Sequence, residues 1–491
     1  MRFCFKKKDF VDKDINPNKL AVIGDNFELN WTQFSERVDN LCNEFITKEF
    51  TNLKYPIIVY GHKSTNMMVA FYAMMKLEIP YIPLDINYPK DRILKIIEIS
   101  KSQLFINTTS SKVEFNKATE VLLKEDKISI FQSNDTLYKS IKEKDPLVYI
   151  IFTSGSTGEP KGVQISTEAI QSFSKWMTND FGFSDNDVFI NTAILSFDLS
   201  VFEVMTFGGI GGTILLNSKS CTSEPNLFME RIQKYNGTVW VSTPSFALIY
   251  SRIGYDSKLA SIKTFLFCGE ILPHGLAKTL VSNFENARTI NTYGPTEATV
   301  ATTIVDITEE ILNTYDPIPV GKPKPECKII VDNGEIVIVG QHVSVGYLNN
   351  PELNKEKFKV IDGQRAFKTG DNGFFKDGML FFDGRNDDLV KLHGYRIELS
   401  EITATINKLS YVLHGETIAL KRNGDVKKIV CLAQLYPNFK HKVDSESIKN
   451  FIATKLPAYM IPSDIKFVDE IPLNQNGKAD KNLLTQIYLQ K

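Results

Sequence analysis

The sequence lacks cysteine pairs and long apolar runs. Its 491 residues include six cysteines, none of them in a Cys-x-x-Cys pair, so neither a zinc cage nor a disulfide framework is predicted. No run approaches the roughly eighteen apolar residues of a membrane-spanning helix. Residues 1–14 lack the apolar stretch of a signal peptide. We therefore expect a cytoplasmic protein without membrane insertion.

The sequence also lacks an excess of charge of either sign. Its 57 basic residues are balanced by 58 acidic ones, which leaves no positive field to hold a phosphate backbone over a long footprint. Nucleic acid is therefore not an expected partner. The six histidines are as dispersed as the cysteines, so we expect any metal to arrive with a nucleotide.

The composition is that of a globular protein with more than one domain. Hydrophobic residues make up 43% of the chain and charged residues 23%, which is close to the average for folded proteins. Single cores stop growing at roughly 250 to 300 residues. The chain should therefore fold into at least two units.

The first half of the sequence alternates buried strands with amphipathic helices. A strand is predicted at Ile57–Tyr60, and a helix over Ser64–Leu77 with Ser64 as its N-cap. The apolar residues at helical spacing, which we expect in the core, are Met67, Met68, Phe71 and Met75. This alternation predicts parallel sheets covered by helices.

The second half changes character after about residue 300. Short strands are predicted at Cys327–Val331 and Ile336–Val339 around an Asn333-Gly334 turn, which indicates a compact β subdomain. Strand and helix patterns alternate again over the last hundred residues or so, enough for a small domain. The polar cluster at residues 383–388 places a boundary there.

A loop rich in glycine and hydroxyl groups follows the apolar strand Leu147–Phe152. It spans Thr153–Gly162, where small residues let backbone N–H groups approach phosphate oxygens and Lys161 adds a cation. A polar turn between two strands is the alternative for any one part of the loop. Ten consecutive residues of this type favour phosphate binding.

The loop differs from the Walker A motif of P-loop ATPases. Pro160 stands where the second glycine should be, and Gly162 replaces the Ser or Thr that follows the lysine. Val163–Ile165 continues as a strand instead of opening a helix. A P-loop motor is therefore disfavoured.

Five motifs occur in an order that resembles the acyl-adenylate-forming enzymes, a superfamily of peptide-synthetase adenylation domains, acyl-CoA synthetases and luciferases. They are Thr153–Gly162, Asn291–Glu297, Thr369–Asp371, Gly384–Asp387 and Asn476–Lys478. The resemblance covers nearly the whole chain. It implies an α/β fold with a large N-terminal domain (residues 1–386) of two α/β subdomains plus a β subdomain. A small α+β domain (387–491) would follow on a hinge.

The resemblance also implies ATP and Mg²⁺ as cofactors. The residues that would bind ATP are Thr153, Ser154, Gly155, Ser156, Thr157, Gly158, Lys161, Asn291, Thr292, Tyr293, Gly294, Thr296, Asp371, Arg385 and Lys478. Tyr293 would cover the adenine, Asp371 and Arg385 would serve the ribose region, and Glu297 would hold Mg²⁺ with the phosphates. Taken singly, Tyr293 fits an ordinary turn better, Glu297 fits a solvated surface carboxylate, and Asp371 and Arg385 fit loop charges equally well.

The chemistry that the resemblance implies depends on the C-terminal domain. A carboxylate is already a nucleophile at neutral pH, so adenylation mainly requires neutralising the charge that builds on the α-phosphate. Lys478 would supply the positive charge that neutralises it. The small domain would then rotate about Asp387, so that the acyl group can be transferred to a thiol. Without the resemblance, a lysine in an Asn-Gly turn is a solvated charge.

The segment Ser196–Val201 resembles the amino-acid-recognising motif of adenylation domains. A carboxylate at Asp198 in an apolar pocket favours a substrate that carries an ammonium. The alternative is an N-cap ahead of a helix that starts at Leu199.

Cys268 and Val300 match pocket positions of the D-alanine-activating ligases in the same superfamily, and Lys391–Arg396 resembles a run of theirs. A thiol at Cys268 would narrow the pocket for a small side chain, although a buried free cysteine is often only core. The resemblance predicts activation of D-alanine and its transfer to a separate phosphopantetheinylated carrier protein for teichoic acid D-alanylation. Leu389, Ala479 and the stretch Val201–Met205 depart from the pattern.

Three other functions stay open. The first is adenylation of glycine, L-alanine or serine for peptide synthesis. The second is acyl-CoA synthesis, against which Asp198 argues. The third is a non-catalytic nucleotide-binding scaffold, which would have no need of Lys478.

Overall fold

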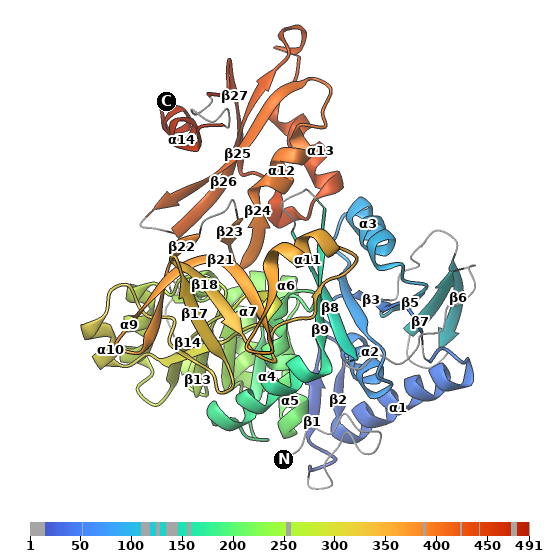
Figure 1. Ribbon diagram of the computed structural model, residues 1–491. Coiled ribbons are helices and arrows are strands. Elements are labelled where there is room, and N and C mark those ends of the chain that lie inside the picture. Colours follow the sequence, from blue (N-terminus) through green and yellow to red (C-terminus); the bar gives the residue numbers. More distant parts are fainter. Residues whose placement is uncertain are drawn as a thin grey trace. The chain divides into compact units, whose positions relative to one another are not determined.

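The structure is a computed structural model whose helices and strands are shown in Figure 1. It describes residues 15–51, 53–109, 118–123, 128–133, 146–154, 159–251, 257–385, 389–422, 425–440, 442–472 and 479–490. Contacts between backbone positions divide the chain into two units. The first draws on Met1–Ile86, Ser100–Ile151 and Gly162–Gly384, and the second on Asn87–Ile99, Phe152–Lys161 and Arg385–Lys491.

One layer of the first unit is a nine-stranded sheet in the order β16-β15-β14-β13-β12-β10-β11-β1-β2. Its strands are β1 (Leu20–Ile23), β2 (Glu28–Asn30), β10 (Val188–Asn191), β11 (Thr213–Leu216), β12 (Val239–Ser242), β13 (Thr264–Phe267), β14 (Arg288–Tyr293), β15 (Thr303–Asp306) and β16 (Lys322–Pro323). The strands from β14 to β1 are parallel, and antiparallel strands close both edges. Parallel strands bring their carboxyl ends to one edge, where ligand sites form.

An eight-stranded sheet follows the order β19-β9-β8-β4-β3-β5-β7-β6. Its strands are β3 (Ile57–Gly61), β4 (Tyr81–Asp85), β5 (Leu104–Asn107), β6 (Ala118–Leu123), β7 (Ile128–Ser133), β8 (Leu147–Thr153), β9 (Lys161–Ser166) and β19 (Gly346–Tyr347). Strands β5, β3, β4 and β8 are parallel. The predicted strands before and after the phosphate loop are confirmed as β8 and β9.

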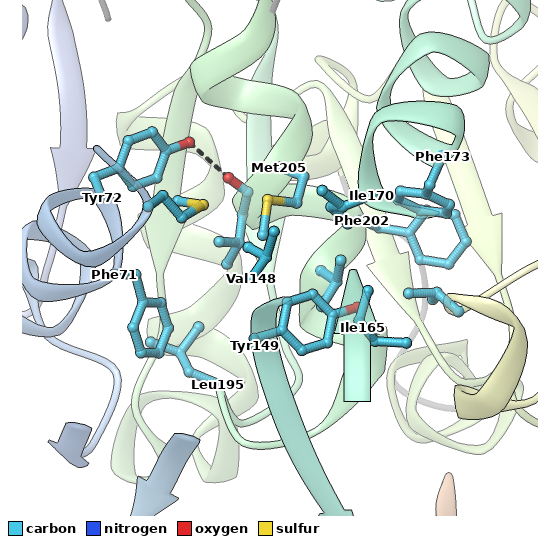
Figure 2. Packing of buried hydrophobic residues seen from close by; sticks show 14 of the residues in the cluster. Phe71, Tyr72, Val148, Tyr149, Ile165, Ile170, Phe173, Leu195, Phe202 and Met205 are labelled. Atoms are coloured by element: carbon cyan, nitrogen blue, oxygen red, sulfur yellow. Dashed lines mark hydrogen bonds between the residues drawn. The ribbon is translucent and has the colours of Figure 1, made fainter. Parts of the chain in front are cut away.

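Helices cover these sheets and pack with them in two apolar clusters. They are α1 (Trp31–Thr47), α2 (Thr65–Lys76), α4 (Thr167–Asp180), α5 (Val201–Ile210), α6 (Lys219–Ser223), α7 (Pro225–Lys234), α8 (Pro244–Ser251), α9 (His274–Asn283) and α10 (Glu309–Thr314). Figure 2 shows Phe71 and Tyr72 of α2 near Tyr149 of β8 and Met205 of α5. The hydroxyl of Tyr72 donates to the carbonyl of Val204 at 2.7 Å, which satisfies the polar atom of a buried ring.

Helix α2 forms as its sequence predicts. The side chain of Ser64 accepts from the backbone N–H of Met67 and caps the helix, which satisfies one of the N-terminal donors that a helix leaves unbonded. The methionines at helical spacing are buried. Their expected place in the core is confirmed.

A third sheet is antiparallel and confirms the predicted β subdomain. It is built from β17 (Lys328–Asp332), β18 (Glu335–Val339), β20 (Phe358–Ile361), β21 (Gln364–Lys376) and β22 (Met379–Arg385), with α11 (Pro351–Lys357) alongside. Asn333 and Gly334 join β17 to β18 with φ angles of 51° and 88°. Both are positive, as a two-residue hairpin turn requires.

The second unit has a small α+β core. Its elements after Gly384 are β23 (Leu389–Leu392), β24 (Tyr395–Glu398), α12 (Leu399–Ile406), β25 (Val412–Arg422), β26 (Asp425–Leu435), α13 (Ser445–Lys455), β27 (Asp464–Val468) and α14 (Lys481–Leu489). Helix α3 (Lys90–Ser100) contributes Arg92, which forms a buried 2.9 Å ion pair with Glu401. The predicted α/β class with a smaller C-terminal part is confirmed.

None of the helices that the structure describes is both long and apolar enough to cross a membrane.

Candidate functional site

Strand β14 carries the Asn291–Tyr293 motif to the carboxyl edge of the nine-stranded sheet. The Asn291 Nδ2 donates to the carbonyl of Pro319 at 3.0 Å, and the Thr292 hydroxyl to that of Phe267 at 2.8 Å. The Asn291 Oδ1 is buried and has no hydrogen-bond donor within the described part of the chain. An unsatisfied buried carbonyl costs about 1–3 kcal/mol, so this atom is a good acceptor for a ligand amine or a water.

The turn after β14 is tightly closed. A Cβ on Gly294 would lie 2.6 Å from the Cα of Ala301, so no other residue fits without moving the backbone. Thr299 and Val300 adopt positive φ angles of 56° and 70°, which a β-branched residue rarely does. Such strain costs about 1–3 kcal/mol per residue and is typical of functional sites.

Tyr293 and Asp371, predicted to serve adenine and ribose, are direct neighbours. The Tyr293 hydroxyl donates to Oδ2 of Asp371 at 2.5 Å, and both side chains are buried. The backbone N–H of Asp371 donates to the Thr369 hydroxyl, which itself donates to the carbonyl of Ile336. Residues far apart in the sequence are thereby held at one place.

Asp198 is not the N-cap of a helix. It lies inside a 3₁₀ turn, Asp198–Ser200, that precedes α5 and has no side-chain cap. Its Oδ2 accepts a 2.6 Å hydrogen bond from the Thr296 hydroxyl, and only 8% of Asp198 is exposed. A buried carboxylate thus points at the turn after β14, and the alternative prediction of an N-cap is wrong.

Cys268 and Val300 also contact each other. The Cys268 Sγ lies 3.8 Å from the carbonyl oxygen of Val300, and both residues are buried. Cys268 follows β13 directly, so it sits one strand away from the Asn291 motif. The two residues predicted to line a small pocket are therefore adjacent.

Glu297 has a partner that the sequence did not reveal. Tyr347 donates its hydroxyl to Oε1 of Glu297 at 2.6 Å, and both side chains are buried. Among the described residues, no group of three or more His, Cys, Asp or Glu side chains could hold a metal. A single carboxylate still suits Mg²⁺, which takes one or two carboxylates together with phosphate oxygens and waters.

Apart from Gly162, the described ends of the phosphate loop lie in the second unit. The Ser154 hydroxyl donates to the carbonyl of Arg396 at 2.8 Å and accepts from the N–H of Glu398. Lys161 forms a buried ion pair of 3.1 Å with Glu398. The Thr153 hydroxyl is buried without a hydrogen-bond partner in the ranges that the structure covers, and it is a second atom available to a ligand.

Several predicted site residues lie outside the described residues. They are Gly155, Ser156, Thr157 and Gly158 of the loop, Asp387 of the hinge and the C-terminal Lys478. Arg385 is described as the last residue of β22 and is partly exposed. The roles predicted for all of them stay predictions.

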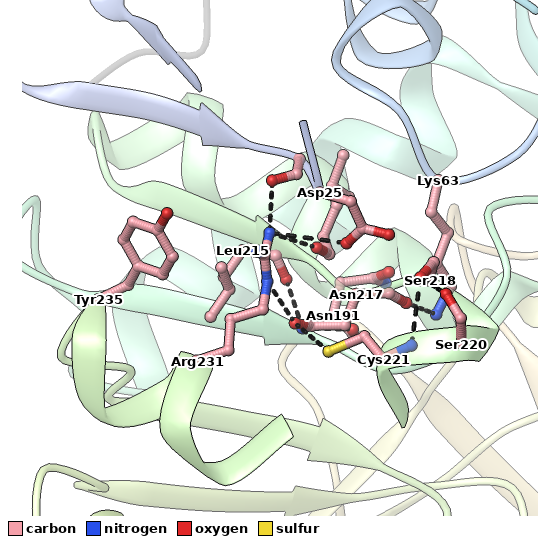
Figure 3. Close-up of polar contacts among 12 residues, drawn as sticks. Asp25, Lys63, Asn191, Leu215, Asn217, Ser218, Ser220, Cys221, Arg231 and Tyr235 are labelled. Atoms are coloured by element: carbon pink, nitrogen blue, oxygen red, sulfur yellow. Dashed lines mark hydrogen bonds and ion pairs between the residues drawn. The ribbon is translucent and has the colours of Figure 1, made fainter. Parts of the chain in front are cut away.

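A buried polar network, also missed from the sequence, lies where β10 and β11 end (Figure 3). Lys63 donates to the carbonyls of Thr192 and Asn217 at 2.5 and 2.8 Å, and burial lowers its pKa to about 8. Glu203 accepts from Asn191 Nδ2 at 3.2 Å, and burial raises its pKa to about 8. The network fixes the loop that leads to Asp198.

The chain is similar to known proteins over most of its length. The AMP-binding enzyme family matches residues 12–348, and the AMP-binding enzyme C-terminal domain matches residues 419–478. The chain belongs to the AMP-binding enzyme family. The first match contains every predicted site residue from Thr153 to Val300.

Two curated relatives of this AMP-binding enzyme match over nearly their full length. The D-alanine--D-alanyl carrier protein ligase of Bacillus licheniformis is 39% identical and covers 96% of each chain. The protein of that name from Bacillus cytotoxicus is 38% identical and covers 96% of this chain and 97% of its own. The shared length extends through both units of the fold.

A solved structure shows the same fold at low identity. The Vibrio cholerae adenylation domain AlmE, in complex with glycyl-adenosine-5'-phosphate, superposes with a TM-score of 0.82. It is 20% identical and covers 97% of this AMP-binding enzyme and 96% of its own chain.

Proposed function

We propose that the chain is an ATP-dependent ligase that adenylates D-alanine and transfers the D-alanyl group to a carrier protein. The observation that carries this proposal is the 39% identity over 96% of both chains with a D-alanine--D-alanyl carrier protein ligase. The described site residues give further support, because binding of the adenosine, the triphosphate and the amino acid each requires particular side chains.

The described residues fit a bound adenosine. The unsatisfied Asn291 Oδ1 is an acceptor of the kind that an exocyclic amine requires. The neighbouring Tyr293 and Asp371 offer a flat ring and a carboxylate, which suit a base face and two ribose hydroxyls. Arg385 would support the same region.

The triphosphate would lie at Thr153–Gly158 and Lys161, with Mg²⁺ held by Glu297 and phosphate oxygens. The ion would neutralise charge that builds on the phosphates during the reaction. The buried hydroxyl of Thr153 can donate to a phosphate oxygen. Lys161 would exchange its carboxylate partner Glu398 for phosphate, since both are anions.

The amino acid would lie between the turns that follow β10, β13 and β14. Asp198 supports binding of an ammonium, because it places a buried carboxylate beside the turn that follows β14. Cys268 and Val300, which contact each other, would line the place of the amino acid's side chain and favour one as small as a methyl group. A fatty acid lacks the ammonium and is disfavoured.

The reaction has two steps. A carboxylate oxygen of D-alanine bonds to the α-phosphorus of ATP, and the bond from that phosphorus to pyrophosphate breaks. The thiolate of a carrier's phosphopantetheine then attacks the acyl carbon, and AMP leaves. We assign neutralisation of the charge on the α-phosphate in the first step to Lys478. Rotation of the small domain between the two steps is assigned to a hinge at Asp387. Teichoic acid is the expected destination of the D-alanyl group.

Exchange between ATP and labelled pyrophosphate tests the first step. We expect exchange with D-alanine to exceed that with L-alanine, glycine and serine by about tenfold or more. One methylene changes binding by about 1–3 kcal/mol, and L-alanine would direct its methyl group to a different side of the site when its ammonium and carboxylate are bound in the same way. Transfer of labelled D-alanine to a phosphopantetheinylated carrier tests the second. Exchange with a large amino acid or a fatty acid in place of D-alanine would refute the proposal.

A further inference from the structure

Three hydrogen bonds join the segment 340–347 to the turn that contains Glu297. The N–H of Ser344 donates to the Glu297 carbonyl at 2.8 Å. The Thr299 hydroxyl donates to the carbonyl of His342 at 2.6 Å, and Tyr347 donates its hydroxyl to the Glu297 carboxylate at 2.6 Å. Two of these contacts use backbone atoms, and only the third reaches the carboxylate itself.

Tyr347 is fixed in place by its own surroundings. The carboxamide of Asn354 accepts from the Tyr347 N–H at 2.6 Å and donates to its carbonyl at 2.9 Å. The Phe358 ring meets the tyrosine edge-on at 5.4 Å, and 2% of Tyr347 is exposed. Its hydroxyl therefore has little freedom to leave the Glu297 carboxylate.

Tyr347 is also joined to the strand that leaves the phosphate loop. In β19 it pairs with Val163 of β9, and the next N–H, of Leu348, donates to the carbonyl of Gly162 at 2.8 Å. Gly162 is the last residue of the predicted phosphate loop. One residue therefore touches both this strand and the carboxylate predicted to bind metal.

We propose that Tyr347 is a positioning residue for the metal site, which sets Glu297 at a fixed place relative to Gly162 and the part of β9 that follows it. The inference rests on the proposed function, because it takes Glu297 as the Mg²⁺ ligand. A hydrogen bond to one carboxylate oxygen fixes the rotation of the group and so the direction of the metal-binding lone pairs. Loss of such an outer partner typically weakens metal affinity about 10- to 100-fold.

The test is Mn²⁺ binding, measured from the electron paramagnetic resonance signal of free Mn²⁺ in the presence of α,β-methylene-ATP. We expect Tyr347→Phe to raise the Mn²⁺ Kd about 10- to 100-fold. In pyrophosphate exchange, the variant should need about 10- to 100-fold more Mg²⁺ to reach its half-maximal rate, which assigns the defect to metal binding. Tyr72→Phe is the matched control, since it removes an equally buried hydroxyl that donates to a backbone carbonyl.

A double mutant shows whether Tyr347 acts through Glu297. In the Glu297→Gln background, Tyr347→Phe should change the Mn²⁺ Kd no further, because the charged ligand is already lost. Asn354→Ala, which releases the Tyr347 backbone at a partly exposed position, should weaken Mn²⁺ binding severalfold. If Tyr347→Phe unfolds at the assay temperature, Asn354→Ala tests instead whether Tyr347 positions Glu297 for metal binding.

An Mn²⁺ Kd within twofold of the wild type in a folded Tyr347→Phe, or in Asn354→Ala where Tyr347→Phe does not fold, would overturn the inference. So would additive effects in the double mutant. If the wild type binds Mn²⁺ with the nucleotide analogue but exchanges no pyrophosphate with D-alanine, the proposed function fails, and the inference about Tyr347 is still decided by the Mn²⁺ Kd of the variants. A wild type that binds no Mn²⁺ under these conditions would overturn the inference while leaving D-alanine exchange to be judged separately.

Discussion

The carboxylate of Asp198 and the hydroxyl of Thr296 lie 2.6 Å apart, although the two residues are separated by 98 positions in the chain. The contact joins the turn after β10 to the turn after β14. It places the only predicted ammonium partner beside a residue of the predicted ATP motif. Amino acid and nucleotide would therefore meet at this contact.

Asp198→Asn should reduce activation of D-alanine by about 10²- to 10³-fold, mostly through KM. The substitution keeps the shape but leaves a buried ammonium without its counter-charge, which costs about 2–5 kcal/mol. Pyrophosphate exchange over a range of D-alanine concentrations measures the effect. Asp306→Asn, which alters an exposed ion pair with Arg288, is the control. An unchanged KM for D-alanine would remove Asp198 from the amino acid site.

Gly294→Ala and Gly275→Ala should have opposite effects on stability. The Cβ at position 294 would meet backbone atoms at 2.6 and 2.9 Å, whereas nothing lies within 4 Å at position 275 in α9. We expect Gly294→Ala to lower the free energy of unfolding by about 1–3 kcal/mol. Gly275→Ala should raise it by about 0.5–1 kcal/mol. Denaturant titration measures both, and equal effects would contradict the tight turn.

Glu203→Gln should stabilise the protein more at pH 8 than at pH 5. Burial raises the pKa of Glu203 from 4.5 to about 8, so the folded protein keeps a proton there that the unfolded chain has lost. Wild-type stability therefore falls as pH rises from 4.5 to 8, and glutamine removes this dependence. The gain should grow by about 2–4 kcal/mol across the window.

Unfolding by denaturant at several pH values measures this gain. Glu309→Gln, at an exposed position in the first turn of α10, is the matched control. A gain from Glu203→Gln that does not vary with pH would show that Glu203 titrates normally in the folded protein.

Lys478→Ala should abolish adenylation while largely preserving thiol transfer. The lysine is assigned to the charge on the α-phosphate, which is absent once the adenylate has formed. Pyrophosphate exchange measures the first step, and carrier loading from supplied D-alanyl adenylate measures the second. If both steps lost activity equally, adenylation and thiol transfer would not depend on different sets of residues.

Local features could be predicted because neighbouring residues determine them. Ser64 caps α2 through a bond to a residue three positions away, and Asn333-Gly334 supplies the positive φ angles of a hairpin. The strands around the phosphate loop are apolar enough to identify directly. For the same reason the motif at residues 291–297 was found, since the site residues there are consecutive.

Contacts between distant residues could not be predicted in this way. Tyr347 meets Glu297 across 50 positions, and Lys63 reaches Asn217 across 154. Neither Tyr347 nor Lys63 stands in a local pattern that differs from an ordinary strand or turn. Asp198 is an example of a local pattern that also allows a wrong role. The pattern is compatible with an N-cap, whereas the hydrogen bond to Thr296 is apparent only in the folded structure.

The successive left-handed residues Thr299 and Val300 have a consequence for folding. A backbone conformation that is unfavourable on its own does not form early in folding. We therefore expect this turn to form only after β14, β15 and the segment around His342 have folded. On heating it should be among the first parts to loosen. The amide of Ala301, which donates to Thr299, would then exchange its hydrogen before the amides of the parallel strands do.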